Sequence, residues 1–222
     1  MSQCNNPEYD LERRFKDIKK ECPRMFYPTE DSILSDQIIH KYVDQLNWQD
    51  VVEFNLISES CIREFQDKVD WTLVSENQKL SEEFIREFQD KVDWTLVSKN
   101  QKLSEAFIRE FQDKVDWKNI AESQKLSEAF IREFKYMFDW QDIALNQKLS
   151  EEFIREFKHM FDPVGWHLIS YSQKLSEAFI REFQNEVNWE FIIRNQKLSK
   201  EFIHEFKHKF NPQTNKSWCQ IQ

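Results

Sequence analysis

The chain has 222 residues, a formal net charge of −9 and 40% hydrophobic residues, with 20 Phe and 8 Trp among them. So much apolar surface excludes a disordered chain, and one Gly with five Pro leaves too few turn residues for a sheet of hairpins. We therefore expect an all-α protein without general affinity for nucleic acid, because phosphate backbones are bound by clustered Lys and Arg; only the stretch 196–222 is rich in lysine.

The first predicted element is a helical cap within residues 1–31. Residues 9–20 have the apolar spacing of an amphipathic helix, and Pro23 and Pro28 then break the chain. The opening residues are polar and acidic, and no apolar run approaches the roughly 18 residues that a membrane helix needs. Neither a signal peptide nor a membrane span is predicted.

A repeat begins after this cap. A Ser recurs every 23 residues, with one step of 26, and a Trp follows 13 residues behind most of these serines. The serines are Ser35, Ser58, Ser81, Ser104, Ser127, Ser150, Ser176 and Ser199. This period predicts an array of about eight 23-residue repeats over residues 32–211.

Each repeat carries two signals for the start of a helix. A Ser followed by Glu caps one helix, because its hydroxyl accepts from free N–H groups while the carboxylate faces the positive end of the helix dipole. An Asp or Asn just before the Trp caps a second helix. The expected caps include Ser81, Ser104, Ser127, Asp70, Asp93 and Asp116. Each repeat is therefore predicted to be helix, tight turn, helix.

The apolar residues of a repeat share one face of each predicted helix. In a longer helix, residues 82–92, Phe84, Phe88 and their neighbours follow spacings of three, four and seven. A shorter helix, residues 71–77, aligns its Trp in the same way. The expected core includes Trp48, Trp71, Trp94, Trp117, Trp140, Trp166, Trp189, Phe84, Phe88, Phe107 and Phe111.

Such short helices are marginal alone in water, and one repeat cannot shield its own Trp and Phe side chains. Stacking solves this, because each repeat covers the exposed face of the one before it. The fold class predicted is an α-solenoid with a helical N-terminal cap.

Two features interrupt the array. A three-residue insertion before Trp166 accounts for the single long step, and it contains Pro163 and the only Gly, Gly165. Pro212 replaces the expected eighth Trp and is predicted to stop the pattern, which leaves residues 212–222 as a C-terminal tail.

One motif matches a metal-binding pattern. Residues 204–208 read HEFKH, the HExxH arrangement in which two His bind zinc and the Glu acts as a general base. Other repeats have Arg-Glu-Phe here, so a single Arg-to-His difference creates the match, and no third ligand is evident. The cysteines, Cys4, Cys22, Cys61 and Cys219, lack CxxC spacing and are expected to be free thiols. We expect no catalytic residue, metal or cofactor; a zinc hydrolase is the least favoured alternative.

Charged residues also repeat. An Arg follows a Glu by four residues in six repeats, a spacing that places the two on one helix face. The arginines are Arg63, Arg86, Arg109, Arg132, Arg155 and Arg181. They are predicted to pair within helices and between repeats; the alternative is a charged stripe for a partner.

The repeats differ most at two positions of the shorter helix, the first and the fifth after the Trp. Both point outward on one face, and Leu145 and Tyr171 are apolar where other repeats have charged residues. The candidate partner-contact residues are Lys118, Gln141, Leu145, His167, Tyr171, Glu190 and Arg194. Neutral drift of a solvated face is the alternative.

The phrase QKLSEEFIREF, followed by DKVDW, resembles short tandem helical repeats encoded by giant DNA viruses of amoebae, such as the mimivirus and marseillevirus groups. The resemblance implies a viral origin and an expanded repeat family. It implies no activity and transfers no catalytic residue. The expected location is then the cytoplasm of the host cell or the virion rather than the secreted fraction.

These features favour a non-enzymatic scaffold that presents a surface to a host or viral protein. A structural protein that assembles with copies of itself is the second hypothesis. No membrane partner is expected.

Overall fold

The computed structural model describes residues 36–209, apart from the side chain of Ile38. These residues form fifteen α-helices and two short 3-10 helices and contain no strand. The prediction of an all-α tandem repeat is confirmed, with a helix pair every 23 residues through most of this part of the chain. The predicted cap in residues 1–31, the tail in residues 212–222 and the first Ser, Ser35, lie outside the described residues.

The chain divides into two compact units, one ending at Val115 and one beginning at Asp116. This boundary falls inside the predicted array. In the first unit the helices are α2 (Asp36–Tyr42), α3 (Trp48–Phe54), α4 (Glu59–Glu64), α5 (Trp71–Asn77), α6 (Glu82–Glu87), α7 (Trp94–Asn100) and α8 (Glu105–Glu110).

The second unit continues the pattern with one longer helix. Its elements are α9 (Trp117–Ser123), α10 (Glu128–Glu133), α11 (Trp140–Asn146), α12 (Glu151–Glu156), η1 (Lys158–Met160), α13 (Pro163–Ser172), α14 (Glu177–Glu182), α15 (Trp189–Asn195), α16 (Lys200–Glu205) and η2 (Lys207–Lys209).

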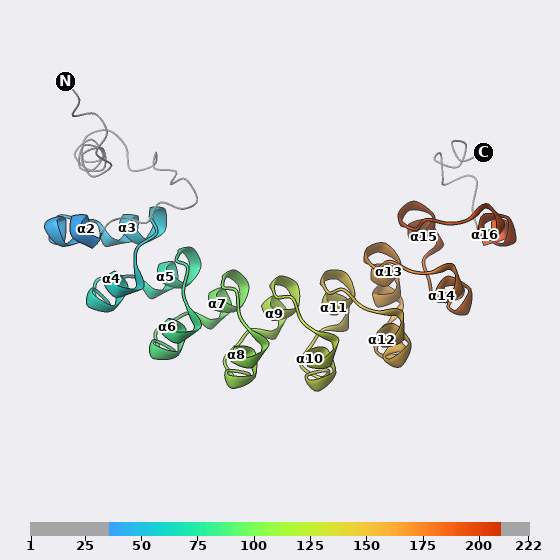
Figure 1. Cartoon of the computed structure of the whole chain (residues 1–222), viewed down its shortest axis with the longest axis horizontal. Helices are drawn as coiled ribbons and strands as arrows, with labels where there is room; N and C mark the ends of the chain where they lie inside the picture. Colours follow the sequence, from blue (N-terminus) through green and yellow to red (C-terminus); the bar gives the residue numbers. More distant parts are fainter. Residues whose placement is uncertain (1–35, 210–222) are drawn as a thin grey trace, which may run out of the picture. The chain divides into compact units, whose positions relative to one another are not determined.

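Within each unit the helices that begin at or near a Trp form one layer, and those that follow a Ser form another (Figure 1). In the first unit α3 contacts α5 and α5 contacts α7. In the second unit α9, α11, α13 and α15 contact one another in sequence. Equivalent helices of successive repeats are therefore neighbours, as stacking requires.

The predicted caps occupy the N-cap positions. Phe84 N–H donates to Ser81 Oγ at 3.1 Å, and Thr72 N–H donates to Asp70 Oδ1 at 2.8 Å. Equivalent bonds reach Ser104, Ser127, Asp93 and Asp116. Because each cap satisfies an N–H group that the first turn leaves without a partner, it fixes where each short helix begins.

The longer helix is shorter than predicted. The pattern of residues 82–92 indicated one helix, but α6 ends at Glu87 and Phe88 leaves helical geometry with φ −110° and ψ 28°. In a continuous helix the Gln89 carbonyl would accept from Asp93 N–H. Instead this carbonyl accepts from the Trp94 indole at 2.9 Å, and Asp93 N–H donates to Ser75 Oγ in the preceding repeat.

Aromatic rings join consecutive repeats. Trp94 lies 4.9 Å from Phe111 and 6.2 Å from Phe107, both in the following repeat, and these two Phe rings are 4.7 Å apart. The same trio occurs around Trp71, Trp117, Trp140, Trp166 and Trp189. Tilted and offset ring pairs at these distances stabilise a core beyond their burial alone.

The Trp side chains are less buried than the Phe side chains. Trp140 and Trp166 are buried, whereas Trp48, Trp71, Trp94, Trp117 and Trp189 are half-buried. The equivalent Phe at the centre of each trio, such as Phe107, is fully buried. The Trp therefore lies at the edge of the core, with one side of the indole covered by the next repeat.

A ladder of glutamines, one from each Gln-Lys-Leu-Ser segment, connects repeats through the backbone, and all of them are buried except Gln196, which is half-buried. Gln101 Nε2 donates to the carbonyls of Gln78 (2.8 Å) and Ser75 (3.3 Å), and its Oε1 accepts from Leu80 N–H (3.0 Å). Gln78, Gln147 and Gln173 make the same three kinds of contact one repeat back. A buried amide that satisfies three backbone groups fixes the spacing of neighbouring repeats.

The charged ladder pairs within and between repeats. Arg86 lies 3.9 Å from Glu82 on its own helix and 2.8 Å from Glu110 in the next repeat. Its guanidinium also lies 5.0 Å from the centre of the Phe107 ring. Glu82 in turn accepts from Ser104 N–H at 2.6 Å. The arginines therefore cover the edge of the aromatic core while joining successive helices.

The first two described repeats depart from the pattern. His40 replaces the ladder Arg in the first repeat, and Cys61 replaces the central Phe of the trio in the second. Trp48 lies 4.9 Å from Phe65, but its indole N–H is buried without a hydrogen-bond partner, whereas the indoles of Trp71 and Trp94 bond a carbonyl five residues earlier. Here α2 continues to Tyr42, one residue longer than the equivalent helices.

Candidate functional site

The candidate contact residues lie on the outward side of the short helices of the second unit. Lys118 is on α9, Gln141 and Leu145 are on α11, His167 and Tyr171 are on α13, and Glu190 and Arg194 are on α15. All are exposed except Gln141, which is half-buried. These four helices contact one another in order, and these seven residues on them are here called the variable face.

The outer helices of this face carry ion pairs. Lys118 lies 3.9 Å from Glu122 on α9, and Arg194 lies 2.8 Å from Glu190 on α15. Both are pairs of residues four apart on one helix, the spacing that brings side chains together. The charges at the two edges of the variable face are thus already partnered by this chain.

The inner helices carry exposed apolar side chains instead. Leu145 on α11 is 41% exposed and Tyr171 on α13 is 54% exposed. The Tyr171 ring meets the Phe191 ring edge-on, with centroids 5.4 Å apart and the planes at 64°. Val164, near the start of α13, is also 47% exposed. Large apolar side chains grouped on neighbouring helices are typical of contact surfaces rather than of a solvated face.

The three-residue insertion lengthens α13 at its N-terminal end. Pro163 is the first residue of the helix, where its fixed φ and missing N–H cost nothing. Asp162 caps the helix, with Gly165 N–H donating to Oδ1 at 2.7 Å. A Cβ atom on Gly165 would lie 3.2 Å from the Phe161 Cβ, so the glycine permits the close approach of this turn.

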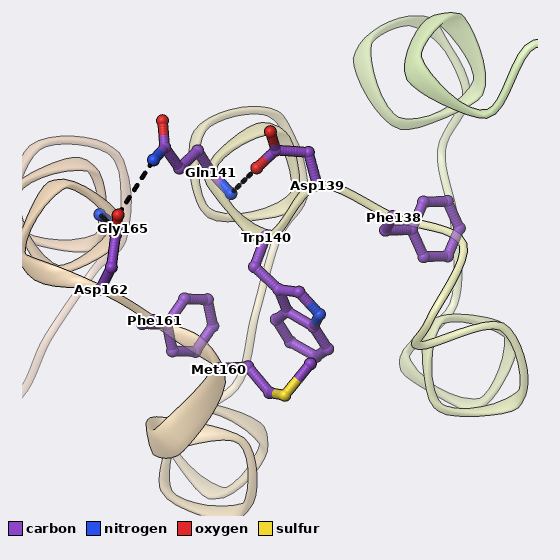
Figure 2. Close-up of a pocket in the computed structure, with 8 residues that line it drawn as sticks. All are labelled: Phe138, Asp139, Trp140, Gln141, Met160, Phe161, Asp162 and Gly165. Carbon is purple, nitrogen blue, oxygen red and sulfur yellow. Dashed lines mark hydrogen bonds between the residues drawn. The ribbon is translucent and has the colours of Figure 1, made fainter.

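A pocket of about 280 Å³ opens between the N-terminal ends of α11 and α13 (Figure 2). It is lined by Phe138, Asp139, Trp140, Gln141, Met160, Phe161, Asp162 and Gly165. Figure 2 shows Gln141 reaching from α11 toward Asp162, with the rings of Trp140 and Phe161 below. Gln141 thus belongs both to the pocket and to the variable face.

Aromatic rings and carboxylates share this pocket. The Phe161 ring meets Trp140 edge-on, with centroids 5.2 Å apart. Asp139 accepts from Gln141 N–H at 2.8 Å, and Asp162 accepts from Gln141 Nε2 at 3.2 Å. The pKa of Asp142, on the first turn of α11, is raised by burial and then by the negative charge of Asp139. This end of α11 and α13 therefore places exposed carboxylates beside rings that are themselves buried.

The HEFKH segment does not form one continuous helix. The helix α16 ends at Glu205, and Phe206 separates it from the 3-10 turn η2, so His204 and His208 do not share consecutive turns of one α-helix. The Glu205 carboxylate lies 2.9 Å from Arg181. Within residues 36–209, no three His, Cys, Asp or Glu side chains are grouped so that they could hold a metal ion.

Sequence reasoning identified the variable face but missed two features. The first is the pocket, which depends on the packing of two turns. The only sequence feature that marked its place was the insertion with Pro163 and Gly165. The glutamine ladder had a signal, since Gln precedes Lys-Leu-Ser in each repeat of this motif. The spacing of this Gln did not indicate that it is buried, and only the structure shows its burial.

Comparisons with known protein families, with curated proteins and with solved structures found no match to this chain. The resemblance to viral tandem repeats stays a prediction. Among the helices that the structure describes, none is long and apolar enough to cross a membrane.

Proposed function

We propose that the protein is a non-enzymatic repeat scaffold that binds another protein through the variable face of its second unit. The observation that carries this proposal is the pair of exposed apolar side chains, Leu145 and Tyr171, on neighbouring helices. The equivalent residues of other repeats, Glu76, Lys99 and Glu122, are charged. The repeat framework does not require an apolar residue there, which supports a role for these two in contact with a partner.

The division between constant and variable residues supports the same proposal. Residues that join repeats, such as the ladder glutamines and the Trp and Phe of each trio, recur with little change. Residues on the variable face differ from helix to helix. A repeat protein uses a uniform core to present a surface whose chemistry is set helix by helix.

The test exchanges the two apolar residues for those of other repeats. Leu145→Glu with Tyr171→Lys leaves the net charge unchanged, and both new residues occupy the same position elsewhere in the chain. Proteins captured by the wild-type chain from lysate would be identified, purified and titrated by calorimetry against each variant. We expect at least about a tenfold loss of affinity, because apolar contacts near the centre of an interface carry most of its energy.

The matched control is Tyr136→His. Tyr136 is 82% exposed but lies in the turn after α10, and His occupies the equivalent position in the next repeat, at His159. This control should bind like the wild type. Equal affinity of the double variant and the wild type would reject the variable face as the binding surface.

Self-association is tested separately by sedimentation velocity. If the chain assembles with copies of itself, the measured mass rises with protein concentration. Loss of that assembly in the Leu145→Glu, Tyr171→Lys variant would make the partner a second copy. A single monomeric species at all concentrations would leave a different protein as the partner.

A further inference from the structure

Exposed lysines recur in the second unit, one just beyond the end of each helix that begins at or near a Trp. Each lies two residues after the last residue of its helix, α9, α11, α13 or α15, and these helices contact one another in order. The four residues, here called the lysine border, are Lys125, Lys148, Lys174 and Lys197.

The ladder glutamine sets the direction of each lysine. At Gln147 the backbone is extended, with φ −100° and ψ 149°, so the side chains of Gln147 and Lys148 lie on opposite sides of the chain. Gln147 is buried and bonds two carbonyls of the preceding repeat, which leaves Lys148 in solvent. The same arrangement holds Lys174 beside Gln173. Each of these lysines is therefore presented by backbone that the ladder holds in place.

The chain does not neutralise these charges. No border lysine makes an ion pair, hydrogen bond or ring contact with another described residue. Between each helix end and the next Ser cap, the lysine is the only charged residue. The Glu after each of the first three of these caps accepts from a Ser N–H of the next repeat, and after the fourth cap this residue is Lys200. In contrast, Lys118 and Arg194 of the variable face are paired.

Lysine recurs at this position although no contact of the fold requires it. All six Gln-Lys-Leu-Ser copies keep it, including Lys79 and Lys102 of the first unit. Three residues earlier the same copies have Glu, Lys, Glu, Leu, Tyr and Arg, and four residues later they have Glu or Ala. The negative end of a helix dipole favours a cation here, but Arg or His would serve it equally. A constant ammonium group on a changing surface favours a negatively charged partner.

We propose that the partner of the variable face is an acidic, amphipathic protein segment. Its carboxylates pair with the lysine border while its apolar side chains contact Leu145 and Tyr171. This inference rests on the proposed function and names the chemistry of the partner. Lys148 follows Leu145 by three residues and Lys174 follows Tyr171 by three, so each exposed apolar residue has an unpaired ammonium group close by in the chain. The ion pairs guide the segment and fix its register, and the apolar contacts supply most of the affinity.

The spacing of the lysines sets the spacing of the acids. Packed helices lie about 8 to 10 Å apart, and an extended chain advances about 3.3 Å per residue. About three residues of an extended segment therefore span one repeat. A segment with an acid at every third position can meet successive lysines and still direct apolar side chains toward the helices.

The probe is a peptide built to this spacing, acetyl-Glu-Leu-Ser-Glu-Leu-Ser-Glu-Leu-Ser-Glu-amide. It carries a rhodamine label, and its binding to the full chain is measured by fluorescence anisotropy. Two further peptides replace every Glu with Gln or with Lys. We expect saturable binding of the Glu peptide and at least about fivefold weaker binding of the Gln peptide, because exposed ion pairs contribute modestly one by one. High salt should remove this difference by screening the charges.

Two variants with equal net charge separate the border from the rest of the unit. Lys148→Gln with Lys174→Gln removes the border charges nearest the exposed apolar residues. The control, Lys158→Gln with Lys207→Gln, removes two exposed charges from η1 and η2, which follow the other layer of helices. We expect at least about fivefold weaker binding of the Glu peptide to the first variant and unchanged binding to the control, since these charges act only at close range.

Reversing the charges gives a second test. Lys148→Glu with Lys174→Glu should bind the Lys peptide more tightly than Lys158→Glu with Lys207→Glu, although both variants have the same net charge. The proposal is overturned if the Glu and Gln peptides bind equally, if the border variant binds the Glu peptide like the wild type, or if the two reversed variants bind the Lys peptide equally. An oligothymidylate with four phosphates that binds as tightly as the Glu peptide would also overturn it, because the border would then be a general polyanion site.

Failure here is distinct from failure of the proposed function. A captured protein that needs Leu145 and Tyr171 but binds the Lys148→Gln, Lys174→Gln variant like the wild type would reject only the acidic partner. Binding of the Glu peptide at the border, in a chain whose captured partners ignore Leu145 and Tyr171, would reject only the proposed function.

Discussion

Gln101 Nε2 donates a hydrogen bond of 2.8 Å to the backbone carbonyl of Gln78, the glutamine at the same position one repeat earlier. Each of these glutamines is both a side-chain bridge to the repeat before it and a backbone acceptor for the repeat after it. The stacking of repeats is therefore fixed by directional hydrogen bonds as well as by hydrophobic burial, which is non-directional.

Removing one of these bridges should be costly. Gln101→Leu keeps the side-chain size but leaves Leu80 N–H and the carbonyl of Gln78 buried without partners, at about 1 to 3 kcal/mol for each unpaired group. We expect the free energy of unfolding, measured with urea, to fall by about 3 kcal/mol. Lys102→Leu, the same change at an exposed neighbour, should alter it by less than about 0.5 kcal/mol. Similar values for the two variants would contradict a structural role for the ladder.

Loss of a Trp should open the core between two repeats. Trp117 lies 4.9 Å from Phe134 and meets the edge of Phe138 at 5.2 Å. We expect Trp117→Ala to lower the free energy of unfolding by about 3 kcal/mol, the low end for large aromatic deletions because the indole is half-buried. Trp117→Phe keeps part of the ring contact and should cost clearly less. Urea unfolding of both variants measures this, and an equal loss would show that the ring contact contributes little.

The first described repeat should lose an ion pair as pH rises. The pKa of His40 is raised from 6.5, first by its hydrogen bond to the Asp36 carbonyl and then by the Glu64 carboxylate. The protonated ring donates to both, at 2.6 Å and 2.8 Å. A raised pKa means that this contribution is complete below 6.5 and disappears as pH passes the higher folded value.

The matched variant for this effect is His40→Arg, which restores the residue of the other repeats. In the wild type, the backbone amides of α2 and α4 should be better protected from hydrogen exchange at low pH than at neutral or alkaline pH. The comparison uses protection factors, which correct for the intrinsic exchange rates. In the Arg variant this difference should vanish. A wild-type His40 whose NMR titration gives an ordinary or lowered pKa would contradict the expectation.

Cys61 should be unreactive while the first unit is folded. Burial, with a smaller effect of Asp36 and Glu64, raises the pKa of its thiol to about 12, so almost no thiolate exists near neutral pH. We expect iodoacetamide at pH 8 to modify Cys61 only after denaturant is added. Mass spectrometry of the peptide that contains Cys61 measures this without interference from the other cysteines. Rapid labelling in native buffer would mean that this repeat opens readily.

Local signals in the sequence were sufficient for the helix starts. Ser81 and Asp70 cap helices because their side chains bond N–H groups two or three residues away, and such bonds depend on neighbouring residues alone. The shorter helix, α5, has the predicted bounds of residues 71–77, and its start is fixed by the Asp70 cap. The ion pairs of Arg86 with Glu82 follow from helical spacing as well.

The end of the longer helix could not be predicted in this way. Apolar spacing continues to Val92, which is buried, so the pattern gave no reason to stop at Glu87. The chain turns because the Trp94 indole donates to the Gln89 carbonyl and Asp93 N–H donates to Ser75 Oγ. Ser75 is 18 residues away along the chain, and its position depends on how two repeats stack.

The sequence by itself therefore determined the repeat, the helix starts, the apolar residues of the core and the outward positions that vary. These depend on spacing and on contacts within a few residues. Only the tertiary structure decided where the longer helices end, that the glutamines are buried bridges, and that Asp139 and Asp162 meet around a pocket. Those features join atoms about 20 residues apart along the chain, and such atoms come together only when successive repeats are packed.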